Sequence, residues 1–173
     1  MSTISGAIPL ESQTAKLAEL LRDIRVAMLT TFPSDKSRPH ARPMYTQGLD
    51  PATFDGTLWF MTDGETTKVH ELAQNAAVLV VYAAPNLNRY VVVNGTARAE
   101  QNVEKARELW GLHAKGWWPN GPEDPNLRLI RVQVDEAEFW DGPSSTSYFI
   151  SLAKALVTGE RIETTGQHGT LRT

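Results

Sequence analysis

Short apolar stretches separated by turn residues recur along most of this 173-residue chain. Residues Leu127–Trp140 alternate between apolar and polar positions, which is the period of a strand with one buried face. Other stretches are apolar throughout, or rich in β-branched and aromatic residues, as strands commonly are. The pattern predicts strands over Val26–Phe32, Arg38–Gln47, Leu58–Thr62, Ala77–Ala83, Arg89–Ala99 and Leu127–Trp140.

Helical spacing appears in other parts of the chain. Residues Thr14–Arg25 carry one apolar stripe, and Thr14 is a candidate N-cap. The stripe consists of Leu17, Leu20, Leu21 and Ile24. The same spacing predicts helices over Lys68–Asn75, Asn102–Leu112 and Tyr148–Val157. The stretch Lys115–Asn126 is too rich in Gly and Pro for regular structure and is expected to be a loop.

The connections between the predicted strands are of hairpin type, without the alternation of strand and helix that builds parallel sheets. We therefore expect a mainly β, α+β fold, a barrel of about six antiparallel strands with helices over its ends. Pro39 and Pro43 predict that their strand is irregular or lies at an edge, and Gly95 predicts a bend or bulge. We expect a single domain over 1–173 with a core of about 14–158 and flexible ends at 1–13 and 159–173, including a frayed tail from Gly166.

Composition excludes several classes of function. With 17 Lys and Arg against 20 Asp and Glu, the formal charge is −3, which gives no basic footprint for nucleic acid. The absence of cysteine excludes disulfides and thiolate sites and fits a reducing cytoplasm. No apolar run is long enough to span a membrane, and the first residues do not resemble a secretory signal, so we expect neither a membrane partner nor secretion.

Side chains alone offer no complete catalytic or metal site. The four histidines lack metal-ligand spacing, and the serines after Pro143 do not form a nucleophile elbow. The glycines form neither a dinucleotide-binding motif nor a P-loop. We therefore expect no metal, and we expect any enzymatic reaction to be carried by a cofactor.

The turn Thr66-Thr67-Lys68 at the start of a predicted helix is a candidate anion site. It would offer free backbone N–H groups, hydroxyls and an ammonium group together. A structural alternative is that Thr66 caps the helix and Lys68 is solvated. Lys68 favours the anion, because a cation in a first helical turn opposes the helix dipole, whereas the neighbouring Asp63 and Glu65 disfavour it.

A second basic segment could serve the same anion. Arg38, His40 and Arg42 alternate and would share one face of their strand. They would form a polar outer face of a hairpin, or Arg42 would bind two phosphate oxygens through its planar guanidinium. Met44 and Tyr45 would then extend towards the ring that carries the phosphate.

The chain also holds 5 tryptophans. Core packing accounts for Trp59 and Trp110. Trp117 and Trp118 lie in the predicted Gly/Pro loop, where they would form an interface or a ligand wall, or fold back on their own barrel.

These segments resemble the general stress protein branch of the pyridoxamine 5′-phosphate oxidase-like flavoproteins, from about Lys16 to Ser144. The resemblance rests on the segments Ala41–Met44, Leu58–Leu72, Tyr90–Ala97 and Glu108–Val132, followed by Glu138–Ser145. The combination of these segments is fairly specific for the family, although any one segment alone is weak evidence for it.

The resemblance implies a split β-barrel homodimer with FMN bound across the subunit interface. It implies that Arg42, Thr66 and Lys68 bind the phosphate, with Thr67 in the same turn. It implies further that the flavin ring lies along two segments and is contacted by tryptophans of the partner subunit. The segments are Pro43–Met44 and Trp59–Phe60–Met61–Thr62, and the tryptophans are Trp117, Trp118 and Trp140.

The function implied is that of an FMN-dependent oxidoreductase acting on a small molecule, with a nicotinamide as a possible reductant. A non-enzymatic flavin carrier or sensor and a deazaflavin-dependent reductase remain alternatives. The chain ends in Gln167–Thr173 without the Arg-Leu-Ser-Pro close associated with the substrate site of true pyridoxamine phosphate oxidases, which argues against vitamin B6 oxidation.

Overall fold

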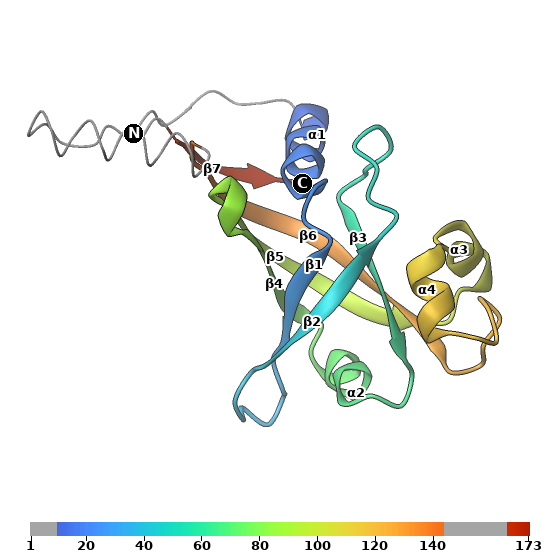
Figure 1. Ribbon diagram of the computed structural model, residues 1–173. Coiled ribbons are helices and arrows are strands. Elements are labelled where there is room, and N and C mark those ends of the chain that lie inside the picture. Colours follow the sequence, from blue (N-terminus) through green and yellow to red (C-terminus); the bar gives the residue numbers. More distant parts are fainter. Residues whose placement is uncertain (1–9, 144–165) are drawn as a thin grey trace, which may run out of the picture.

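Within the residues that the computed structural model describes, 10–143 and 166–173, seven antiparallel strands form one sheet (Figure 1). The strands are β1 (Val26–Thr31), β2 (His40–Gln47), β3 (Thr57–Asp63), β4 (Ala77–Ala84), β5 (Arg89–Glu100), β6 (Leu127–Asp141) and β7 (Gln167–Arg172). Their order is β3-β2-β1-β4-β5-β6-β7, and a further pairing of β3 with β6 closes the first six into a barrel. The predicted mainly β barrel is confirmed.

The barrel wall opens between β2 and β3. Strand β2 pairs with β1 from Val26–Tyr45 to Thr31–His40, but with β3 only at Thr46–Phe60 and Gln47–Trp59. Strand β3 instead pairs with β6 along its whole length. Of the two alternatives predicted for the strand around Pro43, irregular or edge, the structure supports the edge, since most of β2 has a partner on one side only.

The core fills the barrel interior with one side chain in two from each strand. Leu29, Phe60, Val80 and Val91 are fully buried, and each contributes roughly 1.5–3 kcal/mol by leaving water. The predicted apolar helical stripe is confirmed in its packing, because Leu17, Leu20 and Leu21 are no more than 1% exposed.

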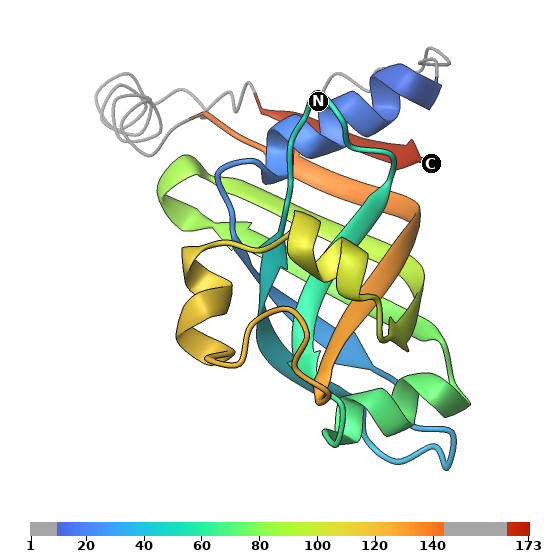
Figure 2. The ribbon, with the colours of Figure 1, turned by 90° about the vertical axis from the view of Figure 1, so that its right-hand side faces the viewer.

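Helices lie at the two ends and on one side of the barrel. They are α1 (Leu10–Leu21), α2 (Thr67–Gln74), α3 (Val103–Glu108) and α4 (Leu112–Trp117), with a short 3₁₀ turn at Pro85–Leu87. Helix α1 lies near β7, and α2 lies at the opposite end, against β1 and β5 (Figures 1 and 2). Helices α3 and α4 lie beside β3 on the right of Figure 1. None of the described helices has the length and apolar character needed to cross a membrane.

Three local predictions differ from the structure. Helix α1 starts at Leu10, so Thr14 lies inside it and does not cap it. Asn102 caps α3 by accepting a hydrogen bond from the backbone N–H of Lys105, and α3 ends at Glu108. The first three residues of the predicted loop, Lys115–Trp117, form the last part of α4. The helix forms despite Gly116, because the packing that buries Ala114 outweighs the low helix propensity of glycine.

The end of the chain was predicted wrongly. Residues Gln167–Arg172 are not a frayed tail, because they form β7 along β6 and bury Leu171 against the core. The bulge predicted at Gly95 is confirmed by a shift in the β5–β6 register between Asn94 and Gly95. The predicted helix over residues 148–157 lies outside the described residues.

Candidate functional site

A cavity of about 600 Å³ occupies the gap where β2 and β3 separate, and α4 covers one side of it. Its lining is mostly apolar and aromatic, and its charged members are Asp63 and Lys68. The lining residues are Val26, Pro43, Met44, Tyr45, Gln47, Met61, Thr62, Asp63, Lys68, His113, Ala114, Trp117 and Trp118. A volume of this size is typical of small-molecule and cofactor sites.

The start of α2 lies beside the cavity without a side-chain cap. The hydroxyl of Thr66 donates to the backbone oxygen of Asp63 at 2.8 Å and so makes no capping bond to the helix. The Asp63 carboxylate accepts from the backbone N–H of Glu65 at 2.8 Å, which holds it within the turn. Thr66 therefore occupies the N-cap position, as the structural alternative expects, but its hydroxyl does not cap the helix. The N–H of Val69 donates to the backbone oxygen of Thr66 at 3.0 Å, so the N–H groups of Thr67 and Lys68 are those that α2 can offer to a ligand.

Lys68 is a half-buried cation at the cavity wall. Its ammonium donates to the Thr62 hydroxyl at 2.9 Å, and within the described residues it forms no ion pair with a carboxylate. Burial, and next the charge of Arg42, lower the pKa of Lys68 below the ordinary 10.5, while Asp63 and Glu71 oppose this shift. The protonated form of Lys68 is thus destabilised here, and a bound anion would relieve that destabilisation.

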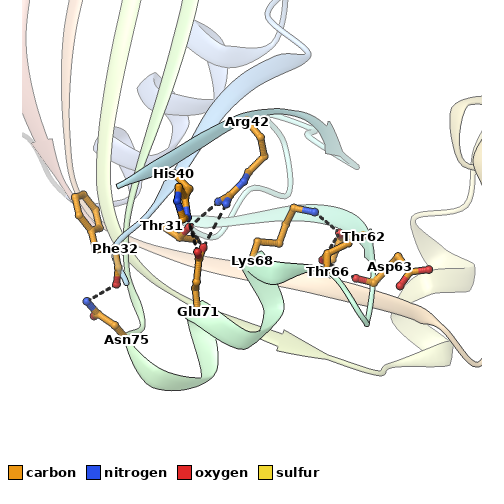
Figure 3. Close-up of polar contacts among 10 residues, drawn as sticks. All are labelled: Thr31, Phe32, His40, Arg42, Thr62, Asp63, Thr66, Lys68, Glu71 and Asn75. Carbon is orange, nitrogen blue, oxygen red and sulfur yellow. Dashed lines mark hydrogen bonds and ion pairs between the residues drawn. The ribbon is translucent and has the colours of Figure 1, made fainter. Parts of the chain in front are cut away.

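Arg42 is held by a buried network that joins β1, β2 and α2 (Figure 3). Its Nη1 donates to the hydroxyl of Thr31 at 2.6 Å, and its Nη2 donates to Oε2 of Glu71 at 3.2 Å. The Thr31 hydroxyl donates in turn to the same Glu71 oxygen at 2.5 Å. The other Glu71 oxygen lies 2.5 Å from Nδ1 of His40.

Glu71 is the buried negative charge of this network, and its residue is only 7% exposed. Burial by itself raises the pKa of its carboxyl. The hydrogen bonds from Thr31, His40 and Arg42 outweigh burial together, and they hold the pKa of Glu71 below its ordinary 4.5. Glu71 is therefore ionised in the folded protein near neutral pH.

The walls of the cavity are flat and apolar. The rings of Tyr45 and His113 stack with centroids 3.9 Å apart and planes at 18°, which links β2 to α4. Trp118 packs against the cluster around Leu109, whereas Trp117 is 73% exposed. The predicted loop tryptophans therefore divide into one wall residue and one exposed residue at the rim.

Gln47 supplies a polar group to this apolar region. Its residue is 7% exposed and lines the cavity. An amide offers both donors and an acceptor. Gln47 can therefore bind a heterocycle edge that carries N–H and C=O groups side by side.

The structure brings together seven of the predicted cofactor-binding residues as cavity lining. They are Pro43, Met44, Met61, Thr62, Lys68, Trp117 and Trp118. Thr66 lies next to this lining through its contact with Thr62, and Arg42 directly precedes the lining residue Pro43 on β2. Figure 3 shows both residues near the start of α2. Thr67 is exposed in the first turn of α2.

The three remaining predicted residues lie elsewhere in the subunit. Phe60 is fully buried in the barrel core, so its side chain cannot contact a ligand in the cavity. Trp59 lines a separate polar groove, where Lys105 lies 5.3 Å from its ring centroid. Trp140 is 37% exposed on the outer barrel face and stacks on His168.

Sequence reasoning missed Gln47, Glu71 and His113. Glu71 follows Lys68 by three positions and so shares its helix face, which is a weak signal that could have been used. No such signal exists for His113 or Gln47. His113 reaches the cavity only through the packing of α4, and Gln47 only through the divergence of β2 from β3. No cluster of three or more candidate metal ligands occurs among the described side chains.

Comparisons with known proteins agree with this architecture. The family model described as pyridoxamine 5′-phosphate oxidase like matches residues 12–163. A protein from Jannaschia sp. CCS1, classed provisionally as general stress protein 26, superposes with a TM-score of 0.74 at 23% identity, covering 95% of this chain and 99% of its own. The general stress FMN/FAD binding protein of Xanthomonas citri has a TM-score of 0.66 at 26% identity, covering 77% of this chain and 91% of its own.

A curated relative is the pyridoxine/pyridoxamine 5′-phosphate oxidase of Bacteroides thetaiotaomicron, which is 29% identical over 123 residues. The alignment covers 67% of this chain but 55% of that enzyme. The present chain thus matches little more than half of its length.

The lowered pKa of Glu71 makes stability depend on pH. A carboxyl whose pKa is lower in the folded state stabilises the fold above its unfolded pKa, and this contribution is lost as pH falls through the folded pKa. We expect the free energy of unfolding, measured by urea denaturation, to fall as pH falls below about 4.5. In Glu71→Gln the decline should be shallower, and at neutral pH the variant should be less stable by about 1–3 kcal/mol.

Glu65→Gln is the matched control, because Glu65 is an exposed glutamate in the turn before α2. It removes the same charge without touching the network. Equal pH profiles for Glu71→Gln and the unchanged protein would contradict the assignment of Glu71 as a stabilising, ionised group.

Proposed function

The chain belongs to the pyridoxamine 5′-phosphate oxidase-like family, and on this basis we propose that its cavity between β2, β3 and α4 binds FMN. The observation that most supports the proposal is the half-buried Lys68 ammonium, which lacks a carboxylate partner among the described residues and lies near the cation Arg42. Two neighbouring cations beside an apolar cavity favour a ligand with an anionic group and a flat apolar body.

The donor set fits a phosphate. Lys68 and Arg42 carry positive charge, and the uncapped start of α2 adds backbone N–H groups and the positive end of a helix dipole. The phosphate of FMN is a dianion near neutral pH, so it would offset the mutual repulsion of the two cations. Asp63 reduces this attraction only in part, because its carboxylate already accepts a hydrogen bond within its own turn.

The walls fit a tricyclic ring with one apolar and one polar end. Met44, Met61 and Trp118 offer apolar contact, and the amide of Gln47 matches the N–H and C=O groups of a pyrimidine edge. When bound, FMN would supply the redox chemistry that side chains do not provide. We propose that the protein is a cytoplasmic oxidoreductase that uses this chemistry on a small molecule, with a nicotinamide as reductant.

We also propose that the protein is a homodimer, because the outer barrel face beside the cavity is apolar. Met28 is 41% exposed and pairs with Pro43 on one side and Val81 on the other. Tyr90 and Trp140, 38% and 37% exposed, continue this face on β5 and β6 as direct cross-strand neighbours. Contiguous apolar surface of this kind marks association sites.

The cavity and the apolar face meet at their edges. Val26, which is 54% exposed on β1, belongs to both, and Pro43 lines the cavity beside Met28. A second subunit on this face would therefore also cover the mouth of the cavity. Such a partner would bring its own Trp140 towards the ligand, which is the role that the family resemblance implies for this residue.

FMN binding is testable with Lys68→Met. We expect the unchanged protein to bind FMN by titration calorimetry, and the variant to bind roughly 10- to 100-fold more weakly, because a charge-assisted hydrogen bond to phosphate is lost. Riboflavin, which lacks the phosphate, should bind both equally. In the unchanged protein, the affinity for FMN relative to that for riboflavin should fall as pH rises through the lowered pKa of Lys68, since only the protonated form of Lys68 attracts phosphate.

Lys115→Met, at an exposed lysine of α4, is the control for removal of one cation. It should leave the FMN affinity unchanged. An unchanged protein that takes up no FMN would exclude the proposal.

Turnover separates an oxidoreductase from a flavin carrier. We expect NADH or NADPH to bleach the visible absorbance of the FMN-loaded protein, and an added acceptor to restore it over many cycles. Tight FMN binding without reduction by either nicotinamide would favour the carrier or sensor. Preferential binding of a deazaflavin over FMN, by competition, would favour the deazaflavin-dependent alternative.

Dimerisation is testable with Met28→Glu, which places a charge in the middle of the apolar face. We expect light scattering to show a dimer for the unchanged protein and a monomer for the variant, because the dimer would bury an unpaired carboxylate. FMN affinity should fall with it, since the cavity loses its cover. Thr96→Glu, at an exposed polar position of β5, is the control, and a monomeric unchanged protein would contradict the proposed assembly.

A further inference from the structure

Arg42, Thr31 and Glu71 form a closed ring of hydrogen bonds. Arg42 Nη1 donates to Thr31 at 2.6 Å, Thr31 donates to Glu71 Oε2 at 2.5 Å, and Arg42 Nη2 donates to the same oxygen at 3.2 Å. The three residues come from β2, β1 and α2, which lie 11 to 40 positions apart in the sequence. Rotation of the guanidinium would break two of these bonds at once.

Burial makes this ring rigid. Thr31 is fully buried, the Glu71 side chain is 9% exposed and that of Arg42 is 20% exposed. Water cannot readily replace the lost partners at such depth, so each broken bond would leave a buried polar group unsatisfied.

The ring leaves part of Arg42 free. A guanidinium has five N–H donors, and Thr31 and Glu71 occupy two of them. Lys68 lies one helical turn before Glu71 on α2, yet its ammonium reaches away from Glu71 to Thr62 (Figure 3). Glu71 therefore holds Arg42 and does not neutralise Lys68 by direct pairing.

We propose that Glu71, with Thr31, positions Arg42 in the anion site, so that the unoccupied N–H groups of the guanidinium face the ligand phosphate together with Lys68. The inference rests on the proposed binding of FMN, and it adds to that proposal two positioning residues which do not themselves contact the ligand. A fixed guanidinium binds more tightly because the entropy of ordering it is already lost in the free protein.

Two other roles of Glu71 would predict different changes in ligand affinity when Glu71 is removed. If Glu71 competed with the phosphate for Arg42, its removal would strengthen binding of FMN. If Glu71 served only to hold α2 on the barrel, its removal would affect FMN and riboflavin alike. Positioning alone predicts weaker binding that is confined to the phosphorylated ligand.

The experiment compares the unchanged protein with Glu71→Gln and Thr31→Val. The first removes the charge, and the second keeps the charge but removes the hydroxyl from the ring. We expect each to weaken FMN binding about tenfold, which corresponds to loss of the ordered charge-assisted contact, and to leave riboflavin binding unchanged. Glu65→Gln, the exposed charge control, should not weaken FMN binding.

A second measurement needs no cofactor. In ¹⁵N NMR spectra of the protein without added flavin, the side chain of Arg42 should show separate, slowly exchanging Nη signals. These signals are assigned to Arg42 because they disappear from the spectrum of Arg42→Lys. Those signals should average in Glu71→Gln and in Thr31→Val. This arm remains decisive for the fixation of Arg42 even if the unchanged protein binds no FMN, an outcome that would overturn the proposed function instead.

Unchanged Arg42 signals in both variants would overturn the positioning role. So would tighter binding of FMN by Glu71→Gln, or an equal loss of FMN and riboflavin affinity. Thr31→Val guards against a folding defect, because valine has the shape of threonine and suits a buried strand position.

Discussion

The site depends on the way the barrel closes. Strand β3 pairs with β6 along its whole length, and this closure frees β2 to separate from β3 after only two residue pairs. A barrel with full β2–β3 pairing would have no gap there. The gap becomes a cavity because α4 covers it from outside, with Ala114 buried and the ring of His113 stacked on Tyr45. Closure through β3 and β6 is thus the constraint from which the cavity follows.

The electrostatics of the site follow from burial at its edge. Lys68 loses part of its hydration there and lies near another cation, so its charged form is disfavoured. Glu71, whose pKa is lowered, accepts a hydrogen bond from Arg42 at the same place. The fold thereby holds two like charges beside an apolar cavity and offsets only one of them. Such partial compensation is compatible with the proposed binding of an anion and with a stable fold in its absence.

The outer surface of the barrel beside the cavity mouth is apolar. Exposed apolar side chains from β1, β5 and β6 adjoin the cavity mouth, where Val26 belongs to both. If subunits associate through this face and a cofactor binds in the cavity, as we propose, the two events are coupled, since one surface serves both. The match to the family model and the similarity to general stress proteins agree with the barrel fold that carries these features.

The sequence by itself determined the strands and their antiparallel arrangement, because these follow from local periodicity and turn residues. It also singled out Lys68 and Arg42 by their charge as candidate anion ligands. The family resemblance placed Trp59 and Phe60 with the cofactor, yet neighbouring side chains of β3 point to opposite faces, so one ring lies in a polar groove and the other in the core. It also predicted a frayed end where Gln167–Arg172 pairs with β6, since a short strand acquires its stability from a partner distant in sequence. Only the tertiary structure decided that Glu71 reaches across from α2 to hold Arg42, because hydrogen bonds between residues 29 positions apart leave no periodic trace in the chain.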